Sequence, residues 1–341
     1  PAGIGKSSLV NELYRVTAAS RGRVAMGKCD QLLHGEPFAA VHQALQDLVR
    51  QTLGEGEAET ALMRERLQEV LGANLSALVE AVPDTRALVG EQPPSLPLSS
   101  SEARNRLNLV LVRTLQAFAT PERPLALFLD DLQWADNATL TLLQTLAGEA
   151  SSTRPLLLVG TYRDTEVTPE HPLTLVRDAL RAAGATWERI HLAPLGLKEI
   201  ARMVCESTAV EAGRALELAG LIHDRTGGNP LAVKSFLRFL HERDLLRFDP
   251  RSRRWEWDLA RIESQGLPED LAALMVAESQ RLPEETRALL QSAAFLGVTF
   301  GFHDLLVAHG ASAAETARAL WTAIERRLVL PLGKDYVLLD P

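Results

Sequence analysis

The sequence predicts an α/β fold with a parallel sheet, followed by a mainly helical C-terminal part. Short apolar runs alternate with longer segments of helical spacing up to about residue 195, which is typical of a sheet covered by helices. The run Leu125–Leu129 is bounded by Pro124 and by two carboxylates, as expected for a strand buried on both faces. After Leu195 the strand-like runs become rare and helical spacing takes over. We therefore expect a sheet-based core first and helical domains after it.

The elements of the core follow from apolar spacing and from the Gly, Pro and Ser residues between them. Helices are expected over Ser7–Ala19, most of Pro37–Ala81, Glu102–Phe118 after a Pro/Ser-rich loop at 92–101, Ala138–Ala150 and Leu173–Ala183. Strands are expected at Arg23–Cys29, Leu125–Leu129, Leu156–Gly160 and Arg189–Leu192. This order places the first domain at residues 1–195, with a helical insertion near 37–118.

Two further domains are expected after the core. Residues 196–245 should form a helical lid, with helices at Leu197–Ser207, Glu211–Thr226 and Leu231–Arg243. Residues 246–341 should contain a hairpin at Leu246–Trp257, helices at Pro268–Arg281, Glu284–Phe295, His303–Ala308 and Ala313–Arg327, and a two-stranded wing at Leu328–Leu332 and Tyr336–Leu339. Helices followed by such a wing resemble a winged-helix domain.

The chain opens on Pro1-Ala2-Gly3-Ile4-Gly5-Lys6-Ser7-Ser8, which is most of a phosphate-binding loop. Gly3 and Gly5 let backbone N–H groups turn inward around an anion, and a helix starting near Lys6 adds its positive end. We expect the stretch from Gly3 to Ser8, Ile4 included, to bind phosphates, with Lys6 reaching the β- and γ-phosphates and Ser7 joining a Mg²⁺ shell.

The first glycine of the full pattern G-x-x-x-x-G-K-[ST] falls immediately before Pro1. A strand usually leads into such a loop. We therefore expect the chain to be part of a longer protein, with the first strand of the sheet ahead of Pro1.

Two carboxylates follow the apolar run at its C-terminal end. In open α/β sheets ligands lie beyond the carboxyl ends of the strands, so Asp130 and Asp131 are expected beside the phosphate loop. Asp130 is the candidate Mg²⁺ ligand, and Asp131 is the candidate that orients an attacking water. Without the glycine loop, two solvated residues in a surface turn would be the better interpretation.

The segment Asp130-Asp131-Leu132-Gln133-Trp134-Ala135-Asp136 resembles the DDxQWAD signature of the STAND branch of AAA+-related ATPases, the signal-transducing P-loop switches. Two more segments match in the expected order. Gly160-Thr161-Tyr162-Arg163-Asp164 is similar to the sensor segment of the family, and Thr226-Gly227-Gly228-Asn229-Pro230-Leu231 is similar to its GxP motif. The resemblance covers nearly the whole chain. It is closest to the ATPase module of large bacterial proteins with a Ser/Thr kinase-like domain before the module and a sensor histidine kinase after it.

The resemblance implies a P-loop NTPase three-layer fold with strand order 5-1-4-3-2, of which four strands would lie in this chain. It implies that Arg163 reads the γ-phosphate and that Pro230 packs near the adenine from the lid. It also implies ATP or ADP with Mg²⁺ as ligands, flanking signalling domains as partners and a homo-oligomer on activation. By position alone, Arg163 could be a surface arginine and Pro230 the start of a helix, while Trp134 is expected to pack and Asp136 to cap a helix.

Composition excludes several other classes. A net charge of −8, from 36 Lys and Arg against 44 Asp and Glu, offers no general attraction to nucleic acid or anionic membranes. No apolar run approaches the roughly 20 residues that span a bilayer, and no signal peptide is visible. Cys29 and Cys205 indicate neither a disulfide framework nor a thiolate zinc site, so a cytoplasmic location is expected. No histidine shows metal or triad spacing.

These observations favour an ATP-dependent signalling switch with slow hydrolysis. Two other interpretations remain open: a catalytically inactive scaffold that joins signalling domains, and a DNA-associated AAA+ protein that uses the winged helix. The basic and aromatic segment Arg251–Trp257 invites the last interpretation, but interleaved acidic residues favour a solvated hairpin. The stimulus, the downstream partner and an arginine finger do not follow from the sequence.

Overall fold

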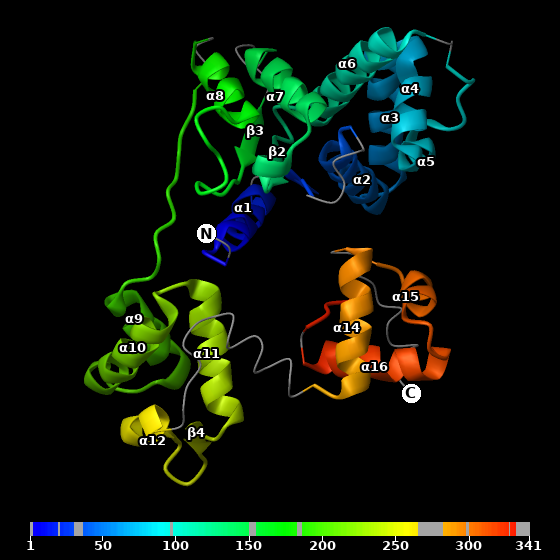
Figure 1. Ribbon diagram of the computed structural model, residues 1–341. Helices are drawn as coiled ribbons and strands as arrows, with labels where there is room; N and C mark the ends of the chain where they lie inside the picture. The colour runs from blue at the N-terminus through cyan, green and yellow to red at the C-terminus, as the bar shows by residue number, and fades with distance from the viewer. Residues whose placement is uncertain are drawn as a thin grey trace. The chain divides into compact units, whose positions relative to one another are not determined.

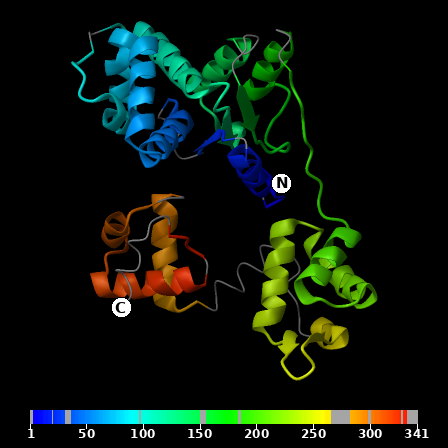
Figure 2. The same cartoon turned by 180° about the vertical axis from the view of Figure 1, so that it is seen from behind.

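The computed structural model describes residues 3–19, 21–30, 37–95, 98–149, 155–182, 186–264, 282–297, 300–326 and 328–331. The chain forms two compact units, Pro1–Ala193 and Pro194–Pro341, and each is described by itself. The first unit is α/β and the described part of the second is mainly helical, as the sequence predicts (Figures 1 and 2).

The first unit contains a parallel sheet and helices that precede and follow each strand. Its described helices are α1 (Lys6–Ala19), α2 (Ala39–Gly54), α3 (Glu57–Leu71), α4 (Leu75–Ala81), α5 (Arg86–Val89), α6 (Ser100–Phe118), α7 (Asn137–Glu149) and α8 (Pro172–Ala182). Its described strands are β1 (Arg23–Lys28), β2 (Leu125–Asp130) and β3 (Leu156–Gly160). Helix α6 begins with a capping box, in which Ser99 and Glu102 satisfy each other's backbone N–H groups.

The strands lie in the order β1-β2-β3, and both pairs are parallel. Lys28 pairs with Asp130 across β1 and β2, and Leu129 pairs with Gly160 across β2 and β3. Because parallel strands run in one direction, the residues that follow them emerge at one edge of the sheet. This edge therefore collects the ends of all the described strands of the sheet.

Strand β2 is the buried centre of the sheet. Each residue from Leu125 to Leu129 is buried, which confirms the expectation of a strand covered on both faces. Strand β3 is less covered, and Leu157 is 53% exposed. Helices α1 and α2 pack against both β1 and β2, and one apolar core joins the sheet to the helical segment that α2 begins.

Helix α2 approaches β1 so closely that its backbone touches the strand. A Cβ atom on Gly27 would lie 1.8 Å from the carbonyl oxygen of Ala40. No side chain fits in that space, so glycine is required here by contact and not by backbone conformation. This contact places the start of α2 directly against β1, and the buried side chains of α2 belong to the core that includes the sheet.

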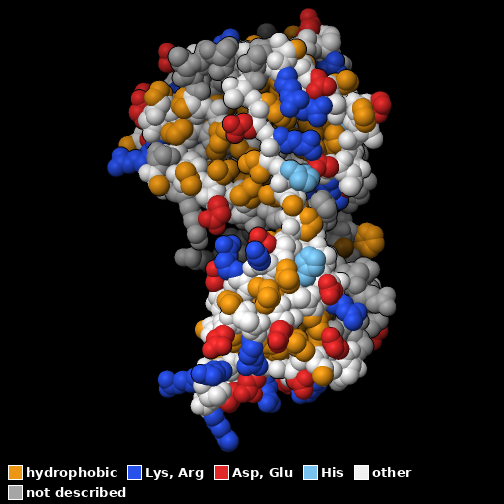
Figure 3. Space-filling model, turned by 90° about the vertical axis from the view of Figure 1, so that its left-hand side faces the viewer, with side chains coloured by type: hydrophobic (Ala, Val, Ile, Leu, Met, Phe, Trp, Pro, Cys, Tyr) orange, Lys and Arg blue, Asp and Glu red, His pale blue; other side chains and the backbone are white. Residues whose placement is uncertain are grey.

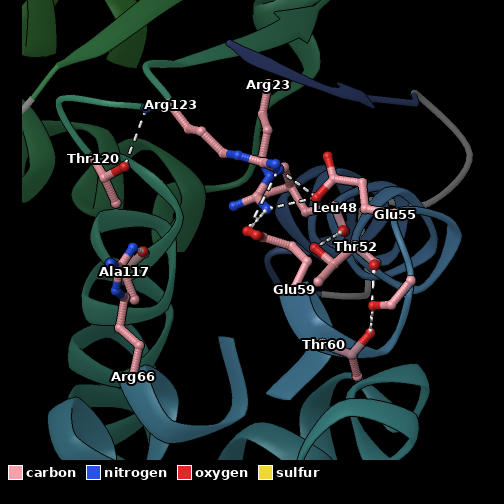
Figure 4. A network of polar contacts seen from close by, with 11 residues as sticks. Arg23, Leu48, Thr52, Glu55, Glu59, Thr60, Arg66, Ala117, Thr120 and Arg123 are labelled. Carbon is pink, nitrogen blue, oxygen red and sulfur yellow. Dashed lines mark hydrogen bonds and ion pairs between the residues drawn. The ribbon is translucent and has the colours of Figure 1, made fainter. Parts of the chain in front are cut away.

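A network of ion pairs ties the end of α2 and the start of α3 to the opposite end of the strands (Figure 4). Arg23, at the start of β1, is 2% exposed and places one guanidinium nitrogen 3.0 Å from Glu55 and 2.7 Å from Glu59. Arg123, just before β2, contacts the same two carboxylates. The guanidinium of Arg23 also lies over the ring of Phe118, 5.6 Å from its centre. The buried charge of Arg23 therefore has two carboxylate partners, as burial of a charge requires.

One strand expectation is wrong. Residues Arg189–Leu192 are described as irregular chain, so the described sheet has three strands in place of the expected four. An extended segment becomes a strand only when a neighbour supplies the hydrogen-bond ladder, and 189–192 pair with no described strand. Side chains hold this segment instead: Arg189 and His191 contact the carboxylate of Asp164.

The second unit begins with a helical group that the sequence locates well. It comprises α9 (Leu197–Thr208), α10 (Ala212–Thr226), α11 (Pro230–Glu242), the antiparallel hairpin β4 (Leu246–Asp249) and β5 (Arg254–Trp257), and α12 (Leu259–Ser264). These elements share one apolar core. Further along are α14 (Glu284–Leu296), α15 (Phe302–His309) and α16 (Ala313–Glu325), which have a core of their own.

The expected winged helix stays a prediction. The helix at Pro268–Arg281 and the wing from 332 onward lie outside the described residues, and 328–331 form bends and irregular chain. The domain bounds at 195 and 245 also stay predictions. None of the described helices is long and apolar enough to cross a membrane.

We expect Gly27→Ala to lower the free energy of unfolding by about 1–3 kcal/mol, because the new methyl group forces α2 away from β1. Urea denaturation followed by circular dichroism measures the change. Gly148→Ala is the matched control, since Gly148 lies in α7 with open space around its Cβ position. That control should be neutral or stabilising by up to about 1 kcal/mol. Equal effects of the two variants would contradict the close contact.

The ion-pair network makes a second prediction. Arg23→Met should cost about 3 kcal/mol, because it leaves two partly buried carboxylates with a single cation. Arg123→Met should cost about 1 kcal/mol or less, since Arg123 is 33% exposed. Denaturation of both variants under the same conditions tests the difference. Equal losses of unfolding free energy in the two variants would show that the burial of Arg23 does not determine the cost of removing it.

Candidate functional site

The phosphate loop has the backbone conformation that its sequence predicts. Gly3 and Gly5 have φ values of 72° and 98°, which glycine adopts without strain. Helix α1 begins at Lys6 directly after the loop, and Ile4 is buried beneath it. The first N–H groups of a helix have no partner within the helix, so they can bind an anion placed at its start. Ser7 and Ser8, in the first turn, are both exposed.

The two predicted Mg²⁺ ligands lie next to each other. The hydroxyl of Ser7 donates a hydrogen bond of 3.2 Å to Oδ2 of Asp130, although the residues are 123 positions apart in the chain. The other carboxylate oxygen of Asp130, Oδ1, accepts from the hydroxyl of Thr161 and from the backbone N–H of Asp131. Thr161, just after β3, and the backbone of Asp131 therefore hold one oxygen of Asp130, and the second contacts Ser7.

Asp131 is buried at 6% exposure and is surrounded by donors and cations. Its Oδ1 accepts from the amide nitrogen of Gln133 at 3.0 Å and lies 3.6 Å from Nε of Arg163. Its Oδ2 lies 4.0 Å from the ammonium nitrogen of Lys28. The backbone of Asp131 has φ 55° and ψ 47°, a left-handed conformation that is uncommon outside glycine. Such conformations collect at functional sites.

Arg163, for which the family resemblance implies a γ-phosphate sensor, lies beside Asp131 at this edge of the sheet. Its guanidinium lies over the ring of Trp134 with 4.8 Å to the ring centre, and it donates to Glu166 at 2.8 Å. The contact to Asp131 completes this set. A guanidinium can donate two parallel hydrogen bonds to the oxygens of a carboxylate or of a phosphate, so the residue type suits a phosphate contact.

Asp136 has the capping role that the sequence predicts. Its carboxylate accepts from the backbone N–H and the hydroxyl of Thr139 in the first turn of α7. It also accepts from the backbone N–H of Phe38, just before α2. Trp134 packs against the core of the unit, as expected.

Pro230 belongs to the second unit, where it occupies the first position of α11. Gly227 ends α10 in a left-handed conformation, and Asn229 caps α11 by accepting from the backbone N–H groups of Leu231 and Ala232. A Cβ on Gly228 would lie 2.1 Å from the carbonyl oxygen of Leu195. The residue types of this segment therefore have structural reasons: Gly227 ends a helix, Gly228 allows a close backbone contact, and Asn229 and Pro230 begin the next helix. A contact of Pro230 with adenine stays a prediction.

The structure brings Ser7, Asp130, Asp131 and Arg163 to one edge of the sheet, beside the loop from Gly3 to Ser8. It adds Lys28, Thr161 and Gln133, to which the sequence analysis gives no role. Thr161 and Gln133 lie within the segments that carry the family resemblance. Their position in those segments is the sequence signal that could have identified them as residues of the site. Lys28 is the last residue of β1, and it lies near Asp131 only because β1 pairs with β2 in this register, which the sequence does not show.

Residues 1–159, just under half of the chain, match the family described as AAA ATPase domain. The match supports a P-loop ATPase module of the AAA+ kind over this stretch. The chain is also similar to hybrid signal transduction histidine kinase G of Dictyostelium discoideum, with 25% identity in an alignment that covers 96% of this chain. The chain spans 11% of the length of that relative. It therefore resembles one part of a much longer signalling protein.

Cys29 follows β1 at the same edge, where its backbone N–H donates to the carbonyl oxygen of Asp130 at 3.0 Å and its side chain is buried. Burial raises the pKa of the Cys29 thiol to about 12, and the carboxylates of Asp136, Asp131 and Asp130 add to the rise. At pH 8 the thiolate fraction is then about one in ten thousand, and the thiolate is the reactive form.

We therefore expect Cys29 to react with iodoacetamide far more slowly than Cys205, which is only partly buried. Mass spectrometry of the two cysteine peptides after timed labelling at pH 8 measures both rates. In about 8 M urea, where the protein is unfolded and both thiols are exposed, the two labelling rates should converge. Similar rates in the folded protein would contradict the burial of Cys29.

Proposed function

We propose that this chain binds ATP with Mg²⁺ and acts as a switch within a signalling protein, with slow ATP hydrolysis. The observation that carries the proposal is the hydrogen bond between Ser7 and Asp130. It joins the first turn after a glycine loop to the end of a buried strand, and these are the two elements that hold Mg²⁺ in P-loop ATPases. The AAA ATPase domain match over residues 1–159 supports the same conclusion.

The residues fit the nucleotide in kind and position. Gly3 and Gly5 have the φ values of an anion-binding loop, and the Cβ position of Gly5 meets nothing within 4 Å. Lys6 would contact the β- and γ-phosphates, and Ser7 and Asp130 would hold Mg²⁺. The bound metal would supply positive charge that neutralises the phosphates. Arg163 would orient the γ-phosphate, and Asp131 would orient a water beside it.

The signalling role rests on the resemblance to part of a hybrid histidine kinase. Kinase-like and sensor histidine kinase domains of the same polypeptide are the partners we propose, with a homo-oligomer in the activated state. Nucleotide binding would order the phosphate loop and Arg163, as phosphate-dependent switches do. Pro230 and the helical group around it would respond as the lid. Both cysteines are free thiols, which suits a reducing cytoplasm.

A nucleic-acid role is less well supported. Arg247 of the β4–β5 hairpin pairs with Glu256, and Asp249 binds the backbone N–H groups of Arg251 and Ser252. On the face drawn in Figure 3, basic and acidic side chains of the described residues are intermingled. Phosphate backbones normally require a broader basic surface.

We expect calorimetric titration of ATP with Mg²⁺ to show binding that Lys6→Ala weakens about 10- to 100-fold, since a charge-assisted hydrogen bond contributes about 1.5–3 kcal/mol. Lys198→Ala is the charge-matched control, because Lys198 is an exposed lysine of α9 in the second unit. The control should leave the dissociation constant unchanged.

Equal binding by the wild type and Lys6→Ala would place the nucleotide elsewhere and contradict the proposal. Absence of binding to the folded wild type would favour the catalytically inactive scaffold. Circular dichroism of each variant shows that the comparison is made between folded proteins.

A further inference from the structure

Gln133 connects the two groups of the site that are proposed to act on the γ-phosphate and on water. Its side-chain nitrogen donates to Oδ1 of Asp131 at 3.0 Å, and its side-chain oxygen accepts from the backbone N–H of Arg163 at 3.2 Å. A carboxylate accepts and an N–H donates, so only one orientation of the amide satisfies both partners. The side chain therefore has a fixed position and a fixed direction.

The backbone of Gln133 is held as well. Its carbonyl oxygen lies 3.1 Å from Nε2 of His171, and Nδ1 of the same ring accepts from the backbone N–H of Leu173 at 3.1 Å. Since Nδ1 accepts, the neutral ring carries its proton on Nε2 and donates it to Gln133. Gln133 is thereby anchored to the start of α8, and it is 7% exposed.

Two cations also lie near Asp131, but farther from it than Gln133. Among the described side chains near this carboxylate, only the amide of Gln133 lies at hydrogen-bond distance; Arg163 and Lys28 lie at 3.6 and 4.0 Å. The side chains of Arg163 and Lys28 are 25% and 41% exposed, whereas Gln133 is 7% exposed. Gln133 is therefore the neighbour that fixes the position of this carboxylate.

We propose that Gln133 is the positioning residue of this site: its amide holds Oδ1 of Asp131 and leaves Oδ2 to orient water beside the bound nucleotide. The inference rests on the proposed ATP hydrolysis and deepens it. It also accounts for the left-handed backbone of Asp131, because the hydrogen bonds from Gln133 and to Thr161 over-determine a conformation that the residue would otherwise avoid. Gln133 acts through Asp131 and does not itself contact the nucleotide.

Two substitutions of similar size separate the two hydrogen bonds of Gln133. Gln133→Glu keeps an acceptor for the N–H of Arg163 but removes the donor to Asp131. Gln133→Met removes both. We expect kcat for ATP hydrolysis to fall about 10- to 100-fold in each variant, because a small misplacement of a reacting group has effects of this size. The dissociation constant for a fluorescent ADP analogue should stay within about 2-fold of wild type, since the phosphate loop is unchanged.

Gln51→Met is the matched control. Gln51 is another partly buried glutamine of the same unit, and its amide donates to the carbonyl oxygen of Val24 at 2.7 Å, near the far end of β1. Its loss should lower stability slightly and leave kcat unchanged. A general packing effect would instead reduce kcat in the control as well.

The outcomes distinguish this inference from the proposed function. Wild-type kcat in Gln133→Glu or in Gln133→Met overturns the inference while ATP hydrolysis stands. A wild-type protein that binds nucleotide without hydrolysing it overturns the inference and the proposed hydrolysis, because no water then requires orientation, while nucleotide binding stands. A wild type that binds no nucleotide overturns both. Loss of kcat at unchanged ADP affinity supports the positioning role.

Discussion

The parallel register of β1, β2 and β3 is the constraint on which the rest of the candidate site depends. Because Lys28 pairs with Asp130 and Leu129 with Gly160, the segments that follow the strands begin at one edge. A shift of one residue along β2 would move Asp130 by about 3.3 Å, out of hydrogen-bond reach of Ser7. The buried side chains of β2 oppose such a shift, so the apolar core sets the geometry of the polar site.

The charged side chains at the two ends of the strands differ in how deeply they are buried. At the start of β1 and β2, the arginines Arg23 and Arg123 share Glu55 and Glu59 in a network whose central member is almost fully buried. At the other edge, the cations around Asp131 keep part of their surface in water. A closed network stabilises the attachment of α2 and α3. In the switch that we propose, these partly exposed cations would exchange a carboxylate for a phosphate when nucleotide binds.

Some residue roles in the site could be predicted from the sequence, and others could not. The roles of Asp136 as a helix cap and Trp134 as a packing residue follow from local chemistry, and the structure confirms both. The strand expected at Arg189–Leu192 was wrong because its apolar alternation does not reveal whether a neighbouring strand is present. Gln133 and Thr161 have polar side chains that suit many surface positions, so their partners become visible only when β2 and β3 lie together.

The sequence by itself determined the α/β class, the helix positions and three of the four expected strand positions of the core, the glycine loop and the acidic residues at the end of β2. These depend on local periodicity, on backbone freedom at glycine and on apolar runs of strand length, all of which are properties of neighbouring residues. The sequence also predicted that Asp130 lies beside the loop that carries Ser7. Only the tertiary structure supplied the hydrogen bond between them, the positions of Arg163 and Lys28 beside Asp131, and the contact of Gln133 with Asp131. Those contacts join residues that are distant in the chain or turned by a strained backbone, and strand pairing and packing bring them together.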